Sequence, residues 1–166
     1  IYGEIFGFGN SFDAFGISEP HPDGRGASLA MARAIEDANL KPNQIAYLNS
    51  HGTSTPKNDL IEAKAIHHTF GEHTKNIQVN ATKSMIGHLI SASGAVDMAA
   101  NLYCGQKGYW HQTINLENLD PDCKLTVTKE NPIKYDGGYI LKNSFAFGGQ
   151  NSSIVFKTNV ETTYEN

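Results

Sequence analysis

Basic residues are scarce in this sequence of 166 residues. Lysine and arginine together number 13 against 17 aspartate and glutamate residues, which gives a net charge of −4 at pH 7. A nucleic-acid-binding domain carries a basic face, and an anionic membrane surface attracts one, so this balance argues against both partners. Long apolar runs are missing too, since none approaches the roughly 20 residues that cross a bilayer.

Cysteine is nearly absent, with Cys104 and Cys123 as the two examples. They form neither a CxxC pair nor a disulfide framework, so a reducing cytoplasm is the expected location. The opening stretch IYGEIFGFGN has no basic start and no long apolar segment, and it therefore does not resemble a signal peptide. The sequence also lacks HExxH and the paired Cys/His spacings that indicate a zinc site.

What the chain does have is an alternation of short strands and periodic helical segments, in a length that fits one domain. Strands are predicted over residues 4–12, 44–50 and 76–82, helices over 27–40, 59–71 and 88–108, and two final strands around a Gly-Gly turn within 138–159. This order indicates an α/β layered domain. In such domains, ligands gather at loops outside the carboxyl ends of strands.

Two of the helices carry further signals. Asp59 is a candidate N-cap of the helix over 59–71, and Gly71 is a candidate stop. The helix over 88–108 is rich in serine, alanine and glycine, which let neighbouring backbone come close. We therefore expect that helix to be central and buried.

Three polar, glycine-bearing loops each follow a predicted strand: HGTSTPKND, TKSMIGH and NSFAFGGQN. One edge of the sheet is expected to collect His51, Lys83 and His88 with the amides of residues 145–149. Two imidazoles, an ammonium and backbone amides suit chemistry in which negative charge develops on oxygen. A polar loop with a histidine is more often only a loop. The residues by themselves therefore indicate an α/β enzyme of unspecified chemistry.

Longer stretches around these loops resemble the C-terminal half of β-ketoacyl-acyl carrier protein synthases, the condensing enzymes of the thiolase-like superfamily. The resemblance runs from Ile1 to Lys157 and includes HGTSTPKND, NATKSMIGHLISASGAVD and NSFAFGGQNSSIVF. It implies a thiolase-like layered αβα half-domain with a mixed sheet, packed against a similar N-terminal half. The domain is expected to span residues 1–158, followed by a tail over 159–166.

The resemblance also implies an activity, the decarboxylative Claisen condensation of malonyl-acyl carrier protein with an acyl thioester. In that family, the two motif histidines, which fall on His51 and His88, help to decarboxylate malonyl and stabilise the enolate. The motif lysine falls on Lys83 and supports the second histidine. No cofactor is implied beyond the phosphopantetheine that the acyl carrier protein bears.

Substrate-binding positions follow from the same resemblance. Thr53 and Thr55 match threonines that line the pantetheine arm, and Phe145 matches the aromatic residue that gates the acyl pocket. Phe147 lies beside it, and Gly148 and Gly149 shape the turn. Structural alternatives remain open: the two phenylalanines alternate as core residues of a strand do, and the threonines suit caps of a turn.

A possible structural monovalent cation is also implied. Asn49, Asp97 and Asn143 match positions that form such a site in some relatives. Here aspartate replaces the usual glutamate, and Lys142 stands where a small residue is common. Because an ammonium near that spot repels or replaces a cation, the sequence leaves the metal open.

The nucleophilic cysteine of the family lies in the N-terminal half, which this sequence does not include. Cys104 and Cys123 are interpreted as structural. The expected partners are an acyl carrier protein and an N-terminal ketosynthase half, in an enzyme that dimerises; a fragment, a cleaved chain and a split subunit all fit. Acyl length, saturation and the choice among fatty-acid, polyketide and polyene synthesis are not encoded in these residues.

Two other functions compete with the condensing activity. One is a non-catalytic partner subunit like a chain-length factor, and the other is a thiolase or related acyl-CoA enzyme. Retention of His51, Lys83 and His88 favours the catalytic ketosynthase, because chain-length factors commonly lose these groups. The thiolase branch usually pairs one histidine with a second cysteine, so two histidines and a lysine favour the malonyl-decarboxylating branch.

Overall fold

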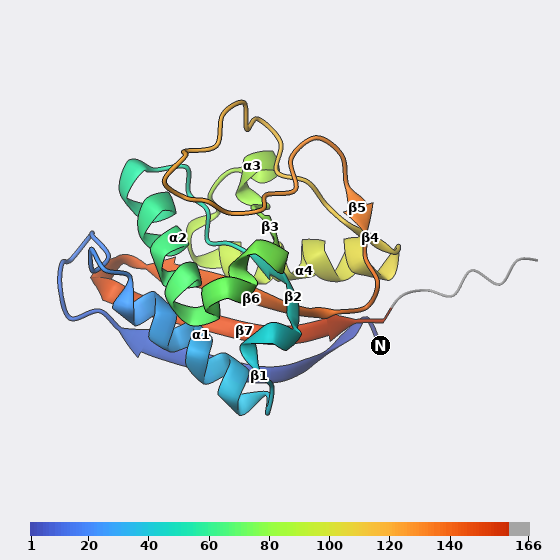
Figure 1. Cartoon of the computed structure of the whole chain (residues 1–166), viewed down its shortest axis with the longest axis horizontal. Coiled ribbons are helices and arrows are strands. Elements are labelled where there is room, and N and C mark those ends of the chain that lie inside the picture. Colours follow the sequence, from blue (N-terminus) through green and yellow to red (C-terminus); the bar gives the residue numbers. More distant parts are fainter. Residues whose placement is uncertain (160–166) are drawn as a thin grey trace, which may run out of the picture.

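A computed structural model describes residues 1–159 and shows a mixed five-stranded sheet with helices on both faces (Figure 1). The strand order is β1-β7-β6-β2-β3, and a separate pair joins β4 to β5. The strands are β1 (Gly3–Phe12), β2 (Ile45–Asn49), β3 (Gln78–Asn80), β4 (Tyr109–Trp110), β5 (Ile133–Lys134), β6 (Tyr139–Ala146) and β7 (Gln150–Thr158). The helices are α1 (Arg25–Asp37), α2 (Pro56–Phe70), α3 (Lys83–Ile86) and α4 (Ser93–Gln106).

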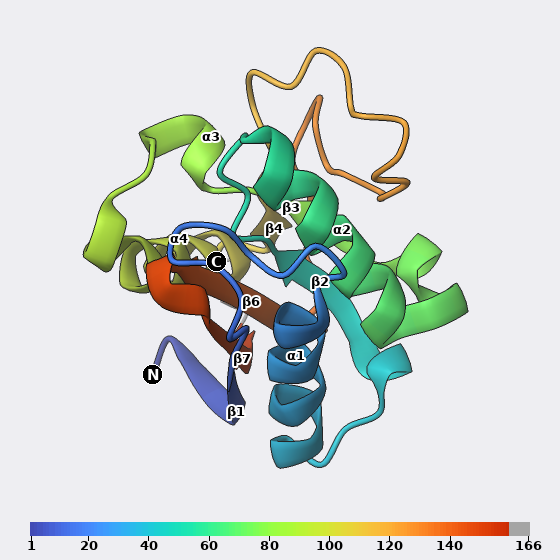
Figure 2. The ribbon, with the colours of Figure 1, turned by 90° about the vertical axis from the view of Figure 1, so that its left-hand side faces the viewer.

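The layers are α, β and α, as Figure 2 shows with α1 and α2 on one side of the sheet and α4 on the other. One core lies between α1, α2 and the sheet and includes Met31, Ile66 and Leu48. The second core lies on the opposite face, where Tyr47 and Trp110 pack with residues of α4. The predicted α/β class with a layered mixed sheet is therefore confirmed.

Helix α1 lies directly against β1, and two glycines of that strand allow the contact. A Cβ atom built on Gly9 would lie 2.2 Å from the carbonyl oxygen of Ala30, and one on Gly7 would lie 2.3 Å from that of Ala34. Any larger residue at either position would therefore push the helix off the strand. The glycine interruptions of the first predicted strand thus have a packing reason.

Helix α2 begins earlier than its sequence suggested. The predicted N-cap, Asp59, is wrong: the helix starts at Pro56, and the Thr55 hydroxyl accepts a hydrogen bond from the Asn58 amide at 3.4 Å. Proline suits the first helical position because a backbone N–H there would have no partner within the helix, so its absence costs no hydrogen bond. Asp59 lies in the first turn and accepts from the Ser54 amide. Gly71 ends the helix at a φ of 52°, as predicted.

Helix α4 is buried on one side only, which corrects the expectation of a central buried helix. Its buried residues recur every fourth position, at Ser93, Asp97, Asn101 and Gly105. Most of these are polar, while Met98 and Leu102 of the same helix pack against the second core. Tyr103 on the outer side is exposed, because no described segment covers that face.

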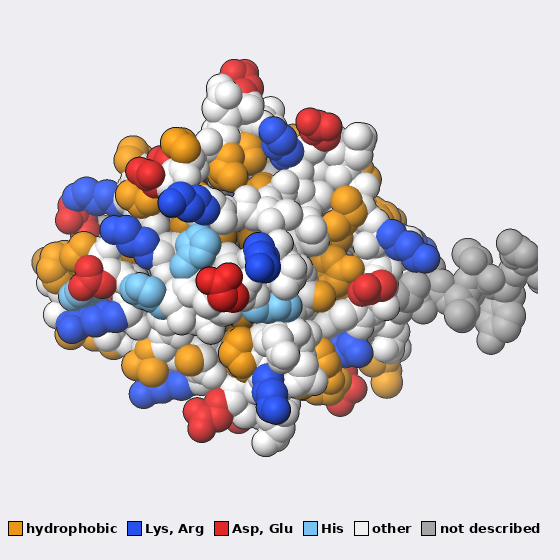
Figure 3. Space-filling model, viewed as in Figure 1, with side chains coloured by type: hydrophobic (Ala, Val, Ile, Leu, Met, Phe, Trp, Pro, Cys, Tyr) orange, Lys and Arg blue, Asp and Glu red, His pale blue; other side chains and the backbone are white. Residues whose placement is uncertain are grey.

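The described residues show no basic face on the side drawn in Figure 3. On the side seen in Figure 3, lysine and arginine side chains are interspersed with acidic ones and with patches of hydrophobic side chains. None of the helices within residues 1–159 is long and apolar enough to cross a bilayer. Of the predicted tail, only Asn159 falls within the described residues, and its amide donates to the carbonyl of Tyr2.

Candidate active site

Three neighbouring parallel strands, β2, β3 and β6, run toward the same edge of the sheet, where the polar segments follow them. Asn49 of β2 pairs in register with Asn80 of β3 and with Lys142 of β6. The carboxyl ends of β2 and β3 therefore align, and β6 runs parallel beside them and continues to Ala146. His51 and residues 83–88 follow β2 and β3, and residues 145–149 span the end of β6 and the turn after it. This is the edge at which the sequence placed the polar loops.

The two histidines from different loops meet there. The rings of His51 and His88 are edge to face with centroids 5.4 Å apart, and the ring of Phe145 lies 5.5 Å from that of His51. His51 is buried, whereas His88 is exposed in this chain. The structure thus brings together three of the predicted site residues, one from each loop.

The electrostatic surroundings keep the His51 imidazole neutral. Burial, followed by the positive charges of Lys83 and Lys142, lowers the pKa of His51 to about 3. A neutral ring retains one N–H group and can donate it to an oxygen that gains negative charge. Its Nδ1 atom is buried and accepts no hydrogen bond within the described part of the chain.

His88 has a defined tautomer when neutral. Its Nδ1 atom accepts the backbone N–H of Ile90 at 2.9 Å and lies 2.9 Å from the hydroxyl of Ser93. Because a backbone amide can only donate, Nδ1 carries no proton and the Ser93 hydroxyl donates to it as well. The ring proton therefore resides on Nε2, which is left as a hydrogen-bond donor.

Glu62 holds the backbone of the His51 loop. One carboxylate oxygen accepts from the His51 amide at 2.8 Å and from Nδ2 of Asn143 at 3.1 Å, and the other accepts from the Gly52 amide at 3.0 Å. A buried glutamate is costly unless its oxygens are satisfied, and here several donors satisfy them. Glu62 was not among the residues predicted from the sequence, although an acid on the apolar side of a helix is a signal for a buried carboxylate.

Lys83 and Lys142 share one carboxylate. Their ammonium groups lie 2.8 Å and 3.1 Å from the same oxygen, Oδ2 of Asp97. All three side chains are at most 5% exposed. Burial lowers the pKa of Lys142 to about 8, against the opposing effect of Asp97. Lys83 thus acts on His51 through its charge while its position is set by Asp97.

A buried network of polar side chains lies next to this ion cluster. Asn49 donates to Asn80 at 2.7 Å and to the Thr82 hydroxyl at 3.0 Å, and Asn80 donates to the carbonyl of His111. The ring of His111 lies 3.1 Å from the same hydroxyl, and Asn101 reaches it as well. Most of its polar atoms have partners, and such connected networks favour one arrangement of the core.

The other predicted substrate-binding residues lie around this edge. The hydroxyls of Thr53 and Thr55 are 2.9 Å apart, and Thr55 also caps α2. Phe147 is 79% exposed, so it is no core residue, whereas Phe145 packs partly into the core. Gly148 and Gly149 both have a φ of 81°, which shapes the turn between β6 and β7.

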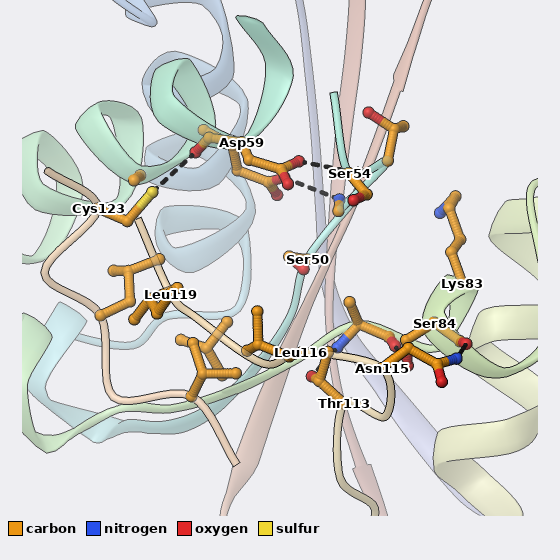
Figure 4. A pocket seen from close by; sticks show the side chains of 18 of the residues that line it. Ser50, Ser54, Asp59, Lys83, Ser84, Thr113, Asn115, Leu116, Leu119 and Cys123 are labelled. Atoms are coloured by element: carbon orange, nitrogen blue, oxygen red, sulfur yellow. Dashed lines mark hydrogen bonds between the residues drawn. The ribbon is translucent and has the colours of Figure 1, made fainter. Parts of the chain in front are cut away.

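A cavity of about 360 Å³ opens beside the His51 loop (Figure 4). Lys83, Ser84 and His88 line one part of it, while Leu119 and Cys123 belong to an apolar part between α2 and the segment that follows β4. Figure 4 shows the Cys123 sulfur directed at the Asp59 carbonyl, 3.9 Å away. The edge of the sheet that carries the polar loops therefore has space for a small ligand next to Lys83 and His88.

Known proteins are similar to this chain in both sequence and fold. The family described as "Beta-ketoacyl synthase, C-terminal domain" matches residues 2–117. The 3-oxoacyl-[acyl-carrier-protein] synthase 2 of Synechocystis sp. is 45% identical over 157 residues, which are 95% of this chain and 38% of that protein. The chain thus spans well under half the length of this curated relative.

Two solved structures superimpose closely. A β-ketoacyl synthase from Burkholderia phymatum has a TM-score of 0.88 and 35% identity, over 96% of this chain and 38% of its own. A type II polyketide synthase acyl-carrier protein in complex with its ketosynthase, bound to the hexaketide, gives a TM-score of 0.92 at 33% identity, over 96% of this chain and 39% of that one.

Proposed function

The chain belongs to the β-ketoacyl synthase family, in which it corresponds to the C-terminal domain, and we propose that it supplies the decarboxylating half of a condensing active site. The substrate of that half is malonyl-acyl carrier protein. The edge-to-face pair of His51 and His88 is the observation that carries the proposal. The complete enzyme is a β-ketoacyl-[acyl-carrier-protein] synthase of fatty-acid or polyketide synthesis.

The chemistry follows from the protonation states of the two rings. When malonyl loses carbon dioxide, the electron pair of the broken carbon–carbon bond moves to the thioester oxygen and forms an enolate. Nε2–H of His88 and the retained N–H of neutral His51 donate hydrogen bonds to that oxygen. The enolate carbon then attacks the acyl thioester on a cysteine of the N-terminal half, and the thiolate leaves.

An N-terminal half is the proposed partner because the surface around His88 is apolar and open. Met85, Ile86, Leu89 and Ile90 all have exposed side chains, and Ile90 is 73% exposed. A site that stabilises an enolate works best when water is excluded. Covering this surface removes apolar area from water and encloses the histidines in one step.

A carrier protein and dimerisation complete the proposed assembly. The ketosynthase with the higher TM-score was solved in complex with its acyl-carrier protein, which supports the same partner here. Thr53 and Thr55 are the proposed contacts of the pantetheine arm, with Phe145 as the gate of the acyl pocket and Phe147, Gly148 and Gly149 at its entrance.

A non-catalytic subunit, like a chain-length factor, is the second candidate. It predicts assembly with a ketosynthase but no decarboxylation by this half. The retention of Lys83 with both histidines, in a cluster that keeps His51 neutral, favours the catalytic alternative.

The test is to produce the chain together with its N-terminal half and follow carbon dioxide release from malonyl-acyl carrier protein. His51→Ala and His88→Ala are each expected to slow release about 100-fold or more, since each removes a donor to the enolate oxygen. His68→Ala, an exposed histidine of α2, is the matched control and should leave the rate unchanged. Release that survives both active-site variants would assign the chain to the non-catalytic class.

A further inference from the structure

The ammonium of Lys142 lies among the residues predicted from the sequence as possible ligands of a monovalent cation. Its side chain is 2% exposed, and its nitrogen lies 3.1 Å from Oδ2 of Asp97. It also donates to the backbone carbonyl of the adjacent Asn143. A carboxylate and a backbone carbonyl are the oxygen ligands that hard cations take in proteins, and here both face a lysine.

Of the remaining groups at this position, the Asn143 side chain is engaged and two oxygens are not. The side chain of Asn143 donates to Glu62 at 3.1 Å and accepts from the Ser153 hydroxyl at 2.7 Å. Oδ1 of Asn49 and Oδ1 of Asp97 are buried and accept no hydrogen bond within residues 1–159. These two oxygens suit a cation only if the local charge permits one.

The local charge does not permit it. The charged groups that act on Lys142 are Asp97 of α4, Lys83 of α3 and Glu62 of α2, while His51 nearby is neutral. Two buried ammonium groups thus balance two buried carboxylates. A further cation would leave an uncompensated positive charge in a buried cluster, which is strongly unfavourable. The predicted ligands Asn49, Asp97 and Asn143 therefore do not fit a monovalent cation in this protein.

We propose that the ammonium of Lys142 is a tethered cation, which takes the place of a metal ion between Asp97 and the carbonyl of Asn143. Lys142 is a positioning residue: it fixes the Asp97 oxygen that holds Lys83, and it ties this oxygen to the start of the segment that leads to Phe145. The arrangement of the site is consequently independent of potassium and sodium. This inference concerns folding and ion response and does not depend on the proposed function.

The experiment compares thermal midpoints of the chain in potassium, sodium and choline chloride at one ionic strength. The wild-type protein is expected to show the same midpoint in all three salts. A higher midpoint in potassium or sodium than in choline would overturn the proposal, and this measurement needs no variant.

Lys142→Ser tests whether an inorganic cation can replace the ammonium once it is removed. The serine removes the ammonium and opens space beside Asp97, so the midpoint in choline should fall by about 5 °C or more. Potassium or sodium should restore a large part of that loss, because an inorganic cation can then take the position. A Lys142→Ser protein with an unchanged midpoint in choline, or with equal midpoints in all three salts, would contradict a cation role.

Two controls separate charge from space. Lys142→Met removes the charge but keeps most of the side-chain volume, so it should lose stability and show no preference among the salts. Lys134→Ser removes an exposed lysine of β5 and should match the wild type in every salt. Rescue of Lys142→Met by potassium as large as that of Lys142→Ser would show a general salt effect and overturn the proposal.

Discussion

The hydroxyl of Ser93 lies 2.9 Å from Nδ1 of His88 and, at the same distance, accepts the backbone N–H of Leu89. Ser93 is buried at the first turn of α4, so its orientation is fixed by the helix. The serine therefore connects the start of α4 to the ring of a histidine on the preceding loop. Together with the Ile90 amide, it holds the proton of the neutral ring on Nε2.

Ser93→Ala should weaken this control of the tautomer. Loss of one hydrogen bond of about 1 kcal/mol predicts an approximately 5-fold slower release of carbon dioxide in the assembled enzyme. Ser93→Thr keeps the hydroxyl and should recover most of the rate, while Ser91→Ala, at an exposed position, serves as the control. Nitrogen-15 spectra of the His88 ring should show a larger share of the Nδ1–H form in Ser93→Ala; an unchanged spectrum would contradict the assignment.

The stability of the folded chain should fall in acid because of His51. Burial and nearby positive charges lower the pKa of His51 from 6.5 to about 3, so the unfolded state binds a proton more tightly than the folded state. Between these two pH values, this residue destabilises the protein as pH falls, by about 1.4 kcal/mol for each pH unit. Chemical denaturation of wild type and His51→Gln should show a difference in unfolding free energy that follows this slope.

If the difference in unfolding free energy between the two proteins does not change over this pH range, His51 has the same proton affinity in the folded and unfolded states, which would contradict the prediction. His68→Gln is the matched control, because it makes the same substitution at an exposed position of α2 and should change the unfolding free energy by less than about 0.5 kcal/mol.

Glu62→Gln should destabilise the loop that carries His51. The amide has one acceptor oxygen in place of two, so it cannot receive both the His51 and Gly52 amides and the side chain of Asn143. A loss of about 2–3 kcal/mol in unfolding free energy is expected, since charged hydrogen bonds to a buried group are lost. Glu36→Gln, on the exposed face of α1, should change stability by less than about 0.5 kcal/mol.

Phe145 and Phe147 should respond differently to truncation, although they are two residues apart. Phe145 packs partly into the core and against His51, so Phe145→Ala should cost about 1–2 kcal/mol of stability. Phe147 is 79% exposed, and Phe147→Ala should cost less than about 0.5 kcal/mol. Urea denaturation measures both, and equal losses would contradict the observed burial.

Neither cysteine should act as the acyl acceptor. Burial raises the pKa of Cys104 and that of Cys123, and the carboxylates of Asp120 and Asp59 raise the latter further. Because the thiolate is the reactive form, both thiols should react with iodoacetamide at pH 7 more slowly than free cysteine. Mass spectrometry after incubation of the assembled enzyme with acyl substrate should find no acyl group on either residue; a thioester on either one would refute this prediction.

Much of the candidate site could be foreseen because its signals are local. His51 lies in one polar loop, and Lys83 and His88 lie in another; both loops directly follow apolar strands, and the structure places them at one edge. Membership of the β-ketoacyl synthase family, predicted from the motifs, is confirmed by the match over residues 2–117. The roles of Thr53 and Thr55 in holding a pantetheine arm remain predictions.

Other features had only weak local signals. The N-cap of α2 was assigned to Asp59 because an acid preceded an apolar run, but proline at position 56 lets the helix start earlier. The burial of α4 was overestimated because its small residues permit close packing without requiring it. Ser93 carried no signal, since a serine in a small-residue helix is ordinary.

The sequence by itself determined the order of strands and helices apart from the short α3, β4 and β5, the polar loops that follow the strands, and the family, because all three depend on residues close together in the chain. Only the tertiary structure decided what those groups do to one another. Lys142 meets Asp97 because the middle of β6 packs beside α4, and Glu62 reaches Asn143 across 81 positions of sequence. Charge and hydrogen bonding act over a few ångströms in space, and which residues come within that range is set by the packing of the sheet and its helices.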